Sequence, residues 1–244
     1  MLELQNVSYN GEDDTPVLKD INLTLQDRKF YVITGPNGGG KSSLAKVIMG
    51  IYQPSAGRIV LDGEDITGLG VTERARRGIG FAFQHPPRFK GITVGELLHL
   101  AGGSQKTAAG CNQLVDVGLC PKDYTGREVN GSLSGGELKR VEIATLLGRK
   151  LKIAIFDEPE AGIDLWSFGR LTETFRRIHA SNEQTTVIIS HQERILELAD
   201  EIILVAEGQV QERGEKEKLL ARILQECDCS KNCLERAVGA NECR

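Results

Sequence analysis

The stretch GPNGGGKS at residues 35–42 constrains the fold of this chain more than any other feature. It fits the pattern G-x-x-x-x-G-K-[ST], follows the apolar run KFYVIT and precedes the helix-like run SLAKVIMG. Glycines let the backbone fold around an anion so that successive N–H groups point at phosphate oxygens, and the following helix adds a favourable dipole. Lys41 is placed to reach the β- and γ-phosphates of a nucleotide, and the Ser42 hydroxyl to ligate Mg²⁺. The sequence therefore predicts a phosphate-binding loop between a buried strand and a helix.

The rest of the chain alternates short apolar runs with helix-like segments, which predicts a mostly parallel sheet flanked by helices. Strands are predicted at LELQNV, VLKDINLTL, GRIVLDGEDI, RGIGFAF, KIAIF, TTVIIS and EIILV. Helices are predicted at SLAKVIMG, from Ser134, at SFGRLTETFRRIHA and over about 215–225. From about residue 93 to 148 the pattern changes to helices broken by glycines. We interpret this stretch as a helical subdomain inserted between two strands of the core.

Composition narrows the class of protein. The 244 residues carry a net charge of −4, so no basic surface dominates and nucleic acid is not the expected partner. No apolar run approaches the ~18 residues that a membrane span requires, so direct membrane insertion is not expected. The N-terminus MLELQNVSYN lacks the layout of a secretion signal. These features together predict a cytoplasmic protein.

Two adjacent carboxylates follow the predicted strand KIAIF, and a nucleotide site needs such groups. Asp157 suits Mg²⁺, usually through water, and Glu158 suits a base that polarises an attacking water. The alternative is that the two acids belong to a solvated turn at the end of the strand. The phosphate-binding loop favours the catalytic interpretation.

A second glycine pair stands before the predicted helix in SGGELKRVEI. Ser134 as N-cap and Glu137 three residues later form a capping box, which explains both residues. Gly135 and Gly136 remain unexplained, because a helix start does not need residues that lower helix stability. Glycines at a helix N-terminus allow close approach of an anion, although the chain already has one phosphate-binding loop.

The order of these motifs resembles that of the ATP-binding cassette (ABC) ATPases. The motifs are GPNGGGKS, Gln84, LSGGE, IAIFDE, AGID and His191, and the resemblance covers about residues 2–213. It implies a P-loop NTPase fold with a RecA-like core, an antiparallel β subdomain and the inserted helical subdomain, over residues 1–226. It also implies a transient ATP-dependent homodimer arranged head to tail. In such a dimer, Ser134, Gly135 and Gly136 of one copy bind the γ-phosphate held by the other.

The resemblance assigns further roles residue by residue. It makes Glu158, His191 and Gln84 catalytic, with Gln84 sensing the γ-phosphate and the metal, and it places Asp164 at the dimer interface. Tyr9 is the candidate to stack on adenine. The expected Mg²⁺ ligands are Ser42, Gln84 and Asp157. The expected nucleotide-binding residues of the loop are Gly35, Pro36, Asn37, Gly38, Gly39, Gly40, Lys41, Ser42 and Ser43.

Several variants within these motifs narrow the resemblance. SGGELKRVEI, DEPEAGID, RGIGFAFQHP and SHQERIL are similar to the ATPases of the SUF iron–sulfur cluster assembly system, the SufC family. This implies that ATP closes two copies, that Glu158 activates water, and that the change is passed to a SufB/SufD-like scaffold protein. One alternative is the cytosolic ATP-binding subunit of an ABC membrane transporter. Another is a non-enzymatic ATP-gated clamp or metal carrier, against which the intact Glu158 argues.

A cysteine-rich tail over residues 227–244 departs from that pattern. Cys227, Cys229, Cys233 and Cys243 give four soft ligands in one segment, which allows an iron–sulfur cluster or a zinc site. The spacing matches no strong metal signature, so a thiol-rich terminus without metal stays open as the alternative.

Overall fold

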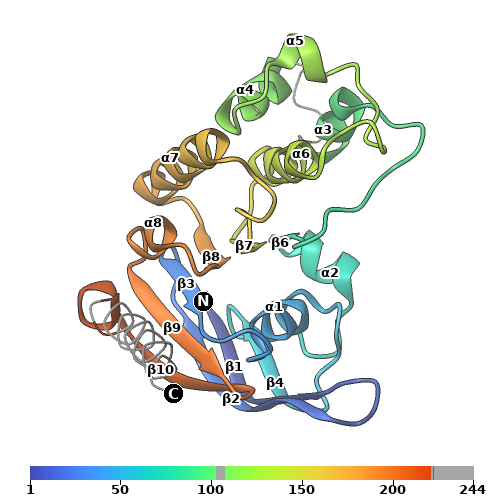
Figure 1. The fold of residues 1–244 in the computed structure, drawn as a ribbon. Helices are drawn as coiled ribbons and strands as arrows, with labels where there is room; N and C mark the ends of the chain where they lie inside the picture. Colours follow the sequence, from blue (N-terminus) through green and yellow to red (C-terminus); the bar gives the residue numbers. More distant parts are fainter. Residues whose placement is uncertain (103–107, 221, 223–244) are drawn as a thin grey trace, which may run out of the picture.

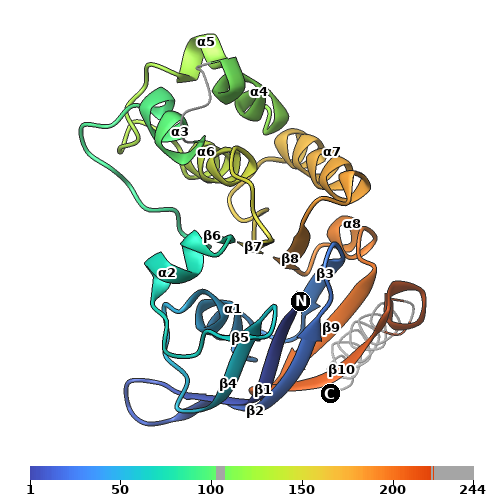
Figure 2. The same cartoon turned by 180° about the vertical axis from the view of Figure 1, so that it is seen from behind.

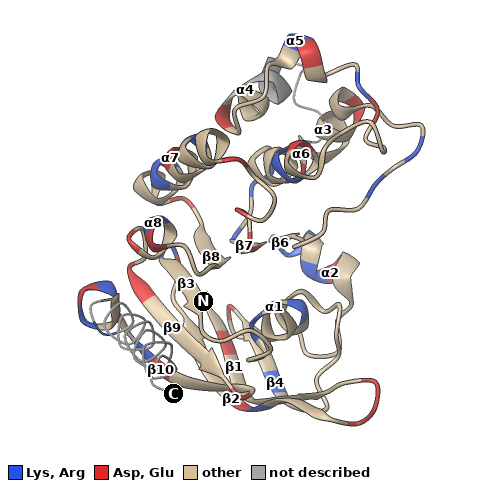
Figure 3. Ribbon diagram, in the orientation of Figure 1, with Lys and Arg blue, Asp and Glu red and all other residues tan. Residues whose placement is uncertain are grey.

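Two β-sheets enclose helix α1 in the computed structural model of this chain, which describes residues 1–102, 108–220 and 222 (Figure 1). Further helices cover the opposite face of the larger sheet, so the layers are sheet, α1, sheet and helices. Basic and acidic residues are both scattered over the sheets and the helices (Figure 3).

The larger sheet has six strands and carries the centre of the core. Five strands run parallel and β10 runs antiparallel to β9. Every residue of β3, β6, β7 and β8 is buried, as expected for apolar runs covered on both faces. The order across the sheet is β10 (Gln209–Glu215), β9 (Glu201–Ala206), β3 (Phe30–Thr34), β8 (Thr185–Ile189), β7 (Ile153–Asp157) and β6 (Ile79–Ala82).

The smaller sheet is antiparallel throughout and packs its apolar face on α1 (Lys41–Met49). Side chains of alternating burial along β2 show that one face is covered and the other solvated. The order of its strands is β2 (Pro16–Leu25), β1 (Leu2–Asn10), β4 (Ala56–Leu61) and β5 (Glu64–Asp65).

Helix α2 (Val71–Arg76) was not expected from the sequence, and its Arg74 explains its position. The Arg74 guanidinium is fully buried and donates to the carbonyls of Val47 and Ile48, each at 2.8 Å. These carbonyls lie in the last turn of α1, where helical partners are missing. Burial lowers the pKa of Arg74 to about 10, and the group still binds as a cation. Arg74 therefore ties α2 to the C-terminal end of α1.

The described residues of the segment predicted as a helical subdomain form four helices, which gather beyond one edge of the large sheet (Figures 1 and 2). Helix α6 packs on α3 and α4 and also on β6, so it joins this group to the sheet. The four helices are α3 (Val94–Gly102), α4 (Ala108–Asp116), α5 (Pro121–Tyr124) and α6 (Gly135–Leu147). Further along the described chain, α7 (Leu165–Ser181) and α8 (Glu193–Leu196) follow before the helical structure that ends the described residues.

The fold confirms the predicted class of architecture, adds helix α2 and changes one boundary. The parallel sheet and the separate antiparallel sheet match the expected P-loop NTPase architecture. The predicted helix over 215–225 begins later, because Glu215 still pairs with Glu201 in the ladder of β10 and β9. Helical structure starts at Lys216, and residues 221 and 223–225 lie outside the described part of the chain. Within the described residues, no helix is long and apolar enough to cross a membrane.

Candidate active site

The phosphate-binding loop lies where β3 ends and α1 begins, as predicted. Gly40 precedes the helix with a φ of +101°. Gly35 has a φ of +134°, and a Cβ at this position would lie 2.1 Å from the carbonyl oxygen of Val205 in β9. Only glycine fits such a conformation so close to another backbone. Gly35 is thus required by the neighbouring strand of the sheet, and not only by an anion.

A cavity of about 650 Å³ opens above this loop. Residues from five separate segments of the chain line it, and most of them are ones that the sequence singled out. The lining residues are Val17, Asn37, Gly38, Gly39, Gly40, Lys41, Ser42, Ser43, Gln84, Glu158 and His191. Gly35 and Pro36 lie behind them and contribute their carbonyl oxygens to Lys41.

Lys41 is folded into its own loop. Its Nζ donates to the oxygens of Gly35 at 2.7 Å and Pro36 at 2.8 Å, and the residue is 5% exposed. Burial lowers the pKa of Lys41, and the carboxylates of Glu158 and Asp157 act in the opposite direction. A nearly buried ammonium in a loop of backbone N–H groups is suited to an anion.

Ser42 and Asp157 provide hard oxygen atoms side by side. The Ser42 Oγ donates to Asp157 Oδ1 at 3.0 Å, and Asp157 is 1% exposed. Burial and the Glu158 charge raise the pKa of Asp157, whereas the Ser42 hydrogen bond and Lys139 lower it. A buried carboxylate beside a hydroxyl at a phosphate-binding loop is the donor set that Mg²⁺ prefers. The residues present fit this metal.

Glu158 and Gln84 meet directly at the edge of the cavity. The Gln84 Nε2 donates to Glu158 Oε2 at 2.7 Å. Glu158 has a φ of +45°, a left-handed backbone conformation that ends β7 at Asp157. His191 lines the same cavity from the segment after β8. Burial and the Lys41 charge lower the pKa of His191, which Glu158 partly opposes.

The predicted helix tip at residues 134–136 does not line this cavity. Its capping box is confirmed, since Glu137 N donates to Ser134 Oγ at 3.2 Å and Ser134 N donates to Glu137 Oε2 at 2.7 Å. A Cβ at Gly135 would meet nothing within 4 Å, whereas a Cβ at Gly136 would lie 2.6 Å from the oxygen of Gly162. Glycine therefore does something different at each position. At Gly136 it allows close packing against the turn at Gly162, and at Gly135 it leaves the surface open.

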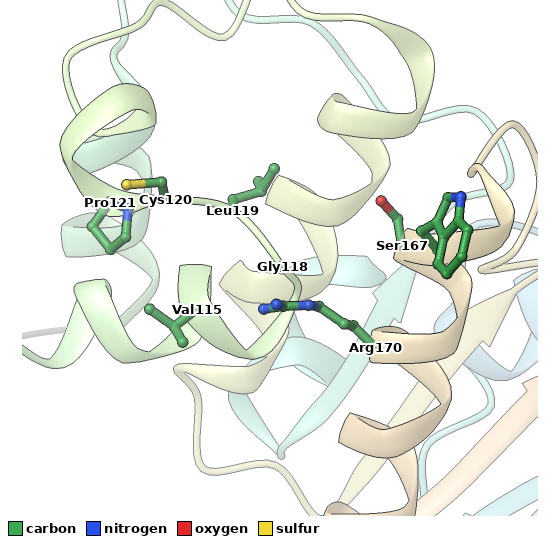
Figure 4. A pocket seen from close by; sticks show the side chains of 8 residues that line it. Val115, Gly118, Leu119, Cys120, Pro121, Ser167 and Arg170 are labelled. Atoms are coloured by element: carbon green, nitrogen blue, oxygen red, sulfur yellow. The ribbon is translucent and has the colours of Figure 1, made fainter.

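Asp164 also lies outside the cavity and caps helix α7. Its Oδ1 accepts from the backbone N–H groups of Trp166 at 3.1 Å and Ser167 at 2.9 Å. Beside it, α7 and the segment between α4 and α5 border a hollow of about 440 Å³ (Figure 4). Trp166 stands at its rim and is 87% exposed. The surface next to Asp164 is thus apolar and open.

Tyr9 lies at the end of β1, outside the cavity lining, and stacks on a residue that the sequence did not single out. The rings of Tyr9 and Tyr52 are 4.8 Å apart and within 5° of parallel, and Lys46 Nζ lies 5.2 Å from the Tyr52 centroid. The strand partner of Tyr9 is Leu18, next to the cavity-lining Val17. The aromatic pair therefore lies where β1 meets the C-terminal end of α1, and neither ring lines the cavity.

The four tail cysteines, Cys227, Cys229, Cys233 and Cys243, lie outside the described residues. Among the residues that are described, no group of three or more His, Cys, Asp or Glu side chains is placed to hold a metal ion.

Sequence reasoning missed two charged residues of α6 that reach the site from behind. Lys139 is 1% exposed, and its Nζ donates to the backbone oxygens of Phe83 and Asp157. Glu142 accepts from the N–H of Phe83 at 3.0 Å. The signal was present in KRVEI, because a Lys and a Glu fall among apolar residues on the buried side of the helix.

The sequence of this chain matches a known protein family and is similar to several known proteins. The family model described as ABC transporter matches residues 18–161. The chain is 37% identical over 230 residues to an uncharacterized ABC transporter ATP-binding protein of Methanocaldococcus jannaschii, covering 90% of each. It is 33% identical over 224 residues to the sulfate/thiosulfate import ATP-binding protein CysA of Synechocystis, covering 88% of this chain and 61% of that relative.

A solved structure shares the fold. It is a dimeric post-hydrolysis state of an ATP-binding cassette bound to ADP and Pi, with a TM-score of 0.79 and 23% identity over 88% of this chain and 99% of that one. The family match covers more than half of the chain and contains both the phosphate-binding loop and the carboxylates after β7. The chain therefore belongs to the ABC transporter family, as an ATP-binding cassette that hydrolyses ATP.

Proposed function

We propose that two copies of this cassette close head to tail around ATP and drive a partner protein. The observation that carries the proposal is the exposed helix tip at residues 134–136, which does not line the chain's own cavity. A helix N-terminus with free N–H groups attracts an anion, and Gly135 leaves room for one to approach. The nucleotide of a second copy supplies that anion.

Within one site, each side chain has a distinct role in ATP hydrolysis. The loop and Lys41 hold the phosphates, while Glu158 polarises the attacking water and Gln84 orients it. His191 contacts the γ-phosphate. Ser42, Asp157 and Gln84 would hold Mg²⁺, which neutralises charge on the phosphates when bound.

For the partner, we propose the permease of a membrane transporter, with this chain as its cytoplasmic subunit. The names of the relatives support it, since one is an ABC transporter ATP-binding protein and another an import ATP-binding protein for sulfate and thiosulfate. The transported substrate of this chain does not follow from them. ATP shifts the pair of cassettes between open and closed states, and this movement changes the conformation of the bound partner.

A second candidate partner is a SufB/SufD-like scaffold for iron–sulfur cluster assembly. It is favoured by the residues of α6 that resemble the SufC family. Lys139 and Glu142 make buried contacts with the segment before Gln84, and Glu137 accepts from the Tyr124 hydroxyl. These residues therefore have structural roles within this chain, and the likeness to the SufC family rests on their sequence pattern.

Purification of the tagged chain from its native cell decides between the partners. A protein with several membrane spans in the ATP-bound complex supports transport, and a soluble scaffold supports cluster assembly. Pairing itself is tested by light scattering of the Glu158→Gln variant with Mg-ATP. If this variant stays a single subunit even with its partner present, the head-to-tail proposal is wrong.

A further inference from the structure

The segment 81–84 leads from β6 to the catalytic cavity, and α6 binds it at one residue, through the two peptide groups on either side of Phe83. Phe83 precedes Gln84 directly, so the position of its backbone decides how far the Gln84 side chain reaches. The Phe83 N–H donates to Glu142 Oε1 at 3.0 Å, and the Phe83 carbonyl accepts from Lys139 Nζ. The donor and the acceptor of one residue are thus both bound by charged side chains of a single helix.

The same helix reaches the strand that carries the acids. Lys139 Nζ also donates to the backbone oxygen of Asp157 at 2.9 Å. The Phe83 ring packs edge-on against Phe81 with centroids 4.8 Å apart, which holds the side chain as well. Gln84 then donates to Glu158 at 2.7 Å. Two hydrogen bonds, one from the Phe83 N–H to Glu142 and one from Gln84 to Glu158, therefore connect α6 through Phe83 to the residue proposed to activate water.

We propose that Glu142 is a positioning residue for ATP hydrolysis, which fixes Phe83 from helix α6 and thereby sets Gln84 against Glu158. The proposal goes beyond the choice of partner and rests only on hydrolysis by this cassette. Glu142 lies eight residues after Ser134, about 12 Å along the helix axis. One rigid helix therefore bears both the tip that faces a second copy and the group that holds the chain's own Gln84.

The role requires an acceptor and not a charge. Glu142 Oε2 is buried, and no described group donates to it. Burial raises the pKa of Glu142 to about 7, against the opposing effects of the Phe83 N–H and Lys139. Besides Glu142, the acidic residues Asp157, Glu158 and Glu160 also interact electrostatically with Lys139. Oε1 accepts the Phe83 N–H whether or not the carboxyl carries a proton, so a glutamine preserves the function and an alanine removes it.

The test compares Glu142→Ala with Glu142→Gln in the full chain. We expect the alanine variant to lose kcat by about 10-fold or more, because the Phe83 N–H stays buried without an acceptor. Its KM for ATP should change by less than about twofold, since the phosphate-binding loop is untouched. The glutamine variant should keep kcat within about threefold of the native value. If Glu142→Ala does not fold, Glu142→Leu replaces it, because leucine fills the space without accepting a hydrogen bond.

Two further measurements separate positioning from stability. Amide exchange at Phe83, without nucleotide or partner, should become about 10-fold faster or more in the alanine variant and stay slow in the glutamine variant. Leu171→Ala is the matched control, a fully buried residue of α7 in the same core. It should lower the melting temperature and leave kcat within about twofold.

The proposal is overturned if Glu142→Ala keeps native kcat, if it loses no more activity than Leu171→Ala at equal melting temperature, or if glutamine rescues nothing. A failure of pairing or of partner binding would leave the Phe83 exchange rates unchanged, so the two proposals fail separately.

Discussion

Alanine at each of the two glycines of the helix tip should have opposite effects on folding and function. Gly135→Ala places a methyl group in open space, because its Cβ meets nothing within 4 Å. Alanine is favoured over glycine in a helix by about 0.5–1 kcal/mol, so the folded chain should be as stable as the native one or slightly more stable. Gly136→Ala places its Cβ 2.6 Å from the oxygen of Gly162. A forced backbone shift costs about 1–3 kcal/mol, which exceeds the helical gain.

The net loss for Gly136→Ala is therefore about 1 kcal/mol, or roughly 2 °C in melting temperature for a chain of this size. Scanning calorimetry measures both variants, and light scattering in the Glu158→Gln background measures pairing with Mg-ATP. Gly135→Ala should melt like the native chain and yet fail to pair, because the methyl group occupies the space of the other copy's phosphate. Native pairing by Gly135→Ala would refute the proposed role of the tip. Equal melting temperatures for the two variants would refute the steric argument.

Three further outcomes are expected. Glu158→Gln should lower phosphate release by about 100-fold or more while nucleotide binding persists, which fluorescent nucleotide titration checks. The folded pKa of Glu142, about 7, lies above its ordinary value of 4.5, so its stabilising effect is full below pH 4.5 and is lost as pH rises through 7. Between pH 4.5 and 8 the free energy of unfolding of the native protein should fall by up to about 3 kcal/mol relative to that of Glu142→Gln. Urea unfolding measures both proteins, and the same pH dependence in both would contradict this expectation. Trp166, the single tryptophan, is 87% exposed beside Asp164, so its emission should shift to shorter wavelength when Glu158→Gln closes with Mg-ATP; an unchanged spectrum in a proven dimer would place Asp164 away from the interface.

The sequence predicts well those parts of the fold that are determined by residues close together along the chain. The apolar runs of β3, β7 and β8 predict buried parallel strands, and the capping box of Ser134 and Glu137 predicts the start of α6. The phosphate-binding loop follows from its own spacing. In each case the signal lies within about ten residues of the structure that it predicts.

The parts that the sequence did not predict depend on contacts between distant segments. Gly35 is required by Val205, and Arg74 binds the last turn of a helix that ends 25 residues earlier. Lys139 and Glu142 fall among apolar residues of α6, but the groups that they bind, at Phe83 and Asp157, are set by the packing of α6 against distant segments. Tyr52 became part of an aromatic pair because β1 and the end of α1 meet in space.

The close approach of Gly136 to the oxygen of Gly162 has a consequence for engineering. The start of α6 and the turn before Asp164 form a close backbone contact, in which a Cβ at Gly136 would lie 2.6 Å from the Gly162 oxygen. A chimaera that imports only one of the two segments, from a cassette with a larger residue at position 136 or a differently placed turn, will not fit at this contact. Exchanging both together preserves it, so these two stretches, 26 residues apart along the chain, should be treated as one transferable unit.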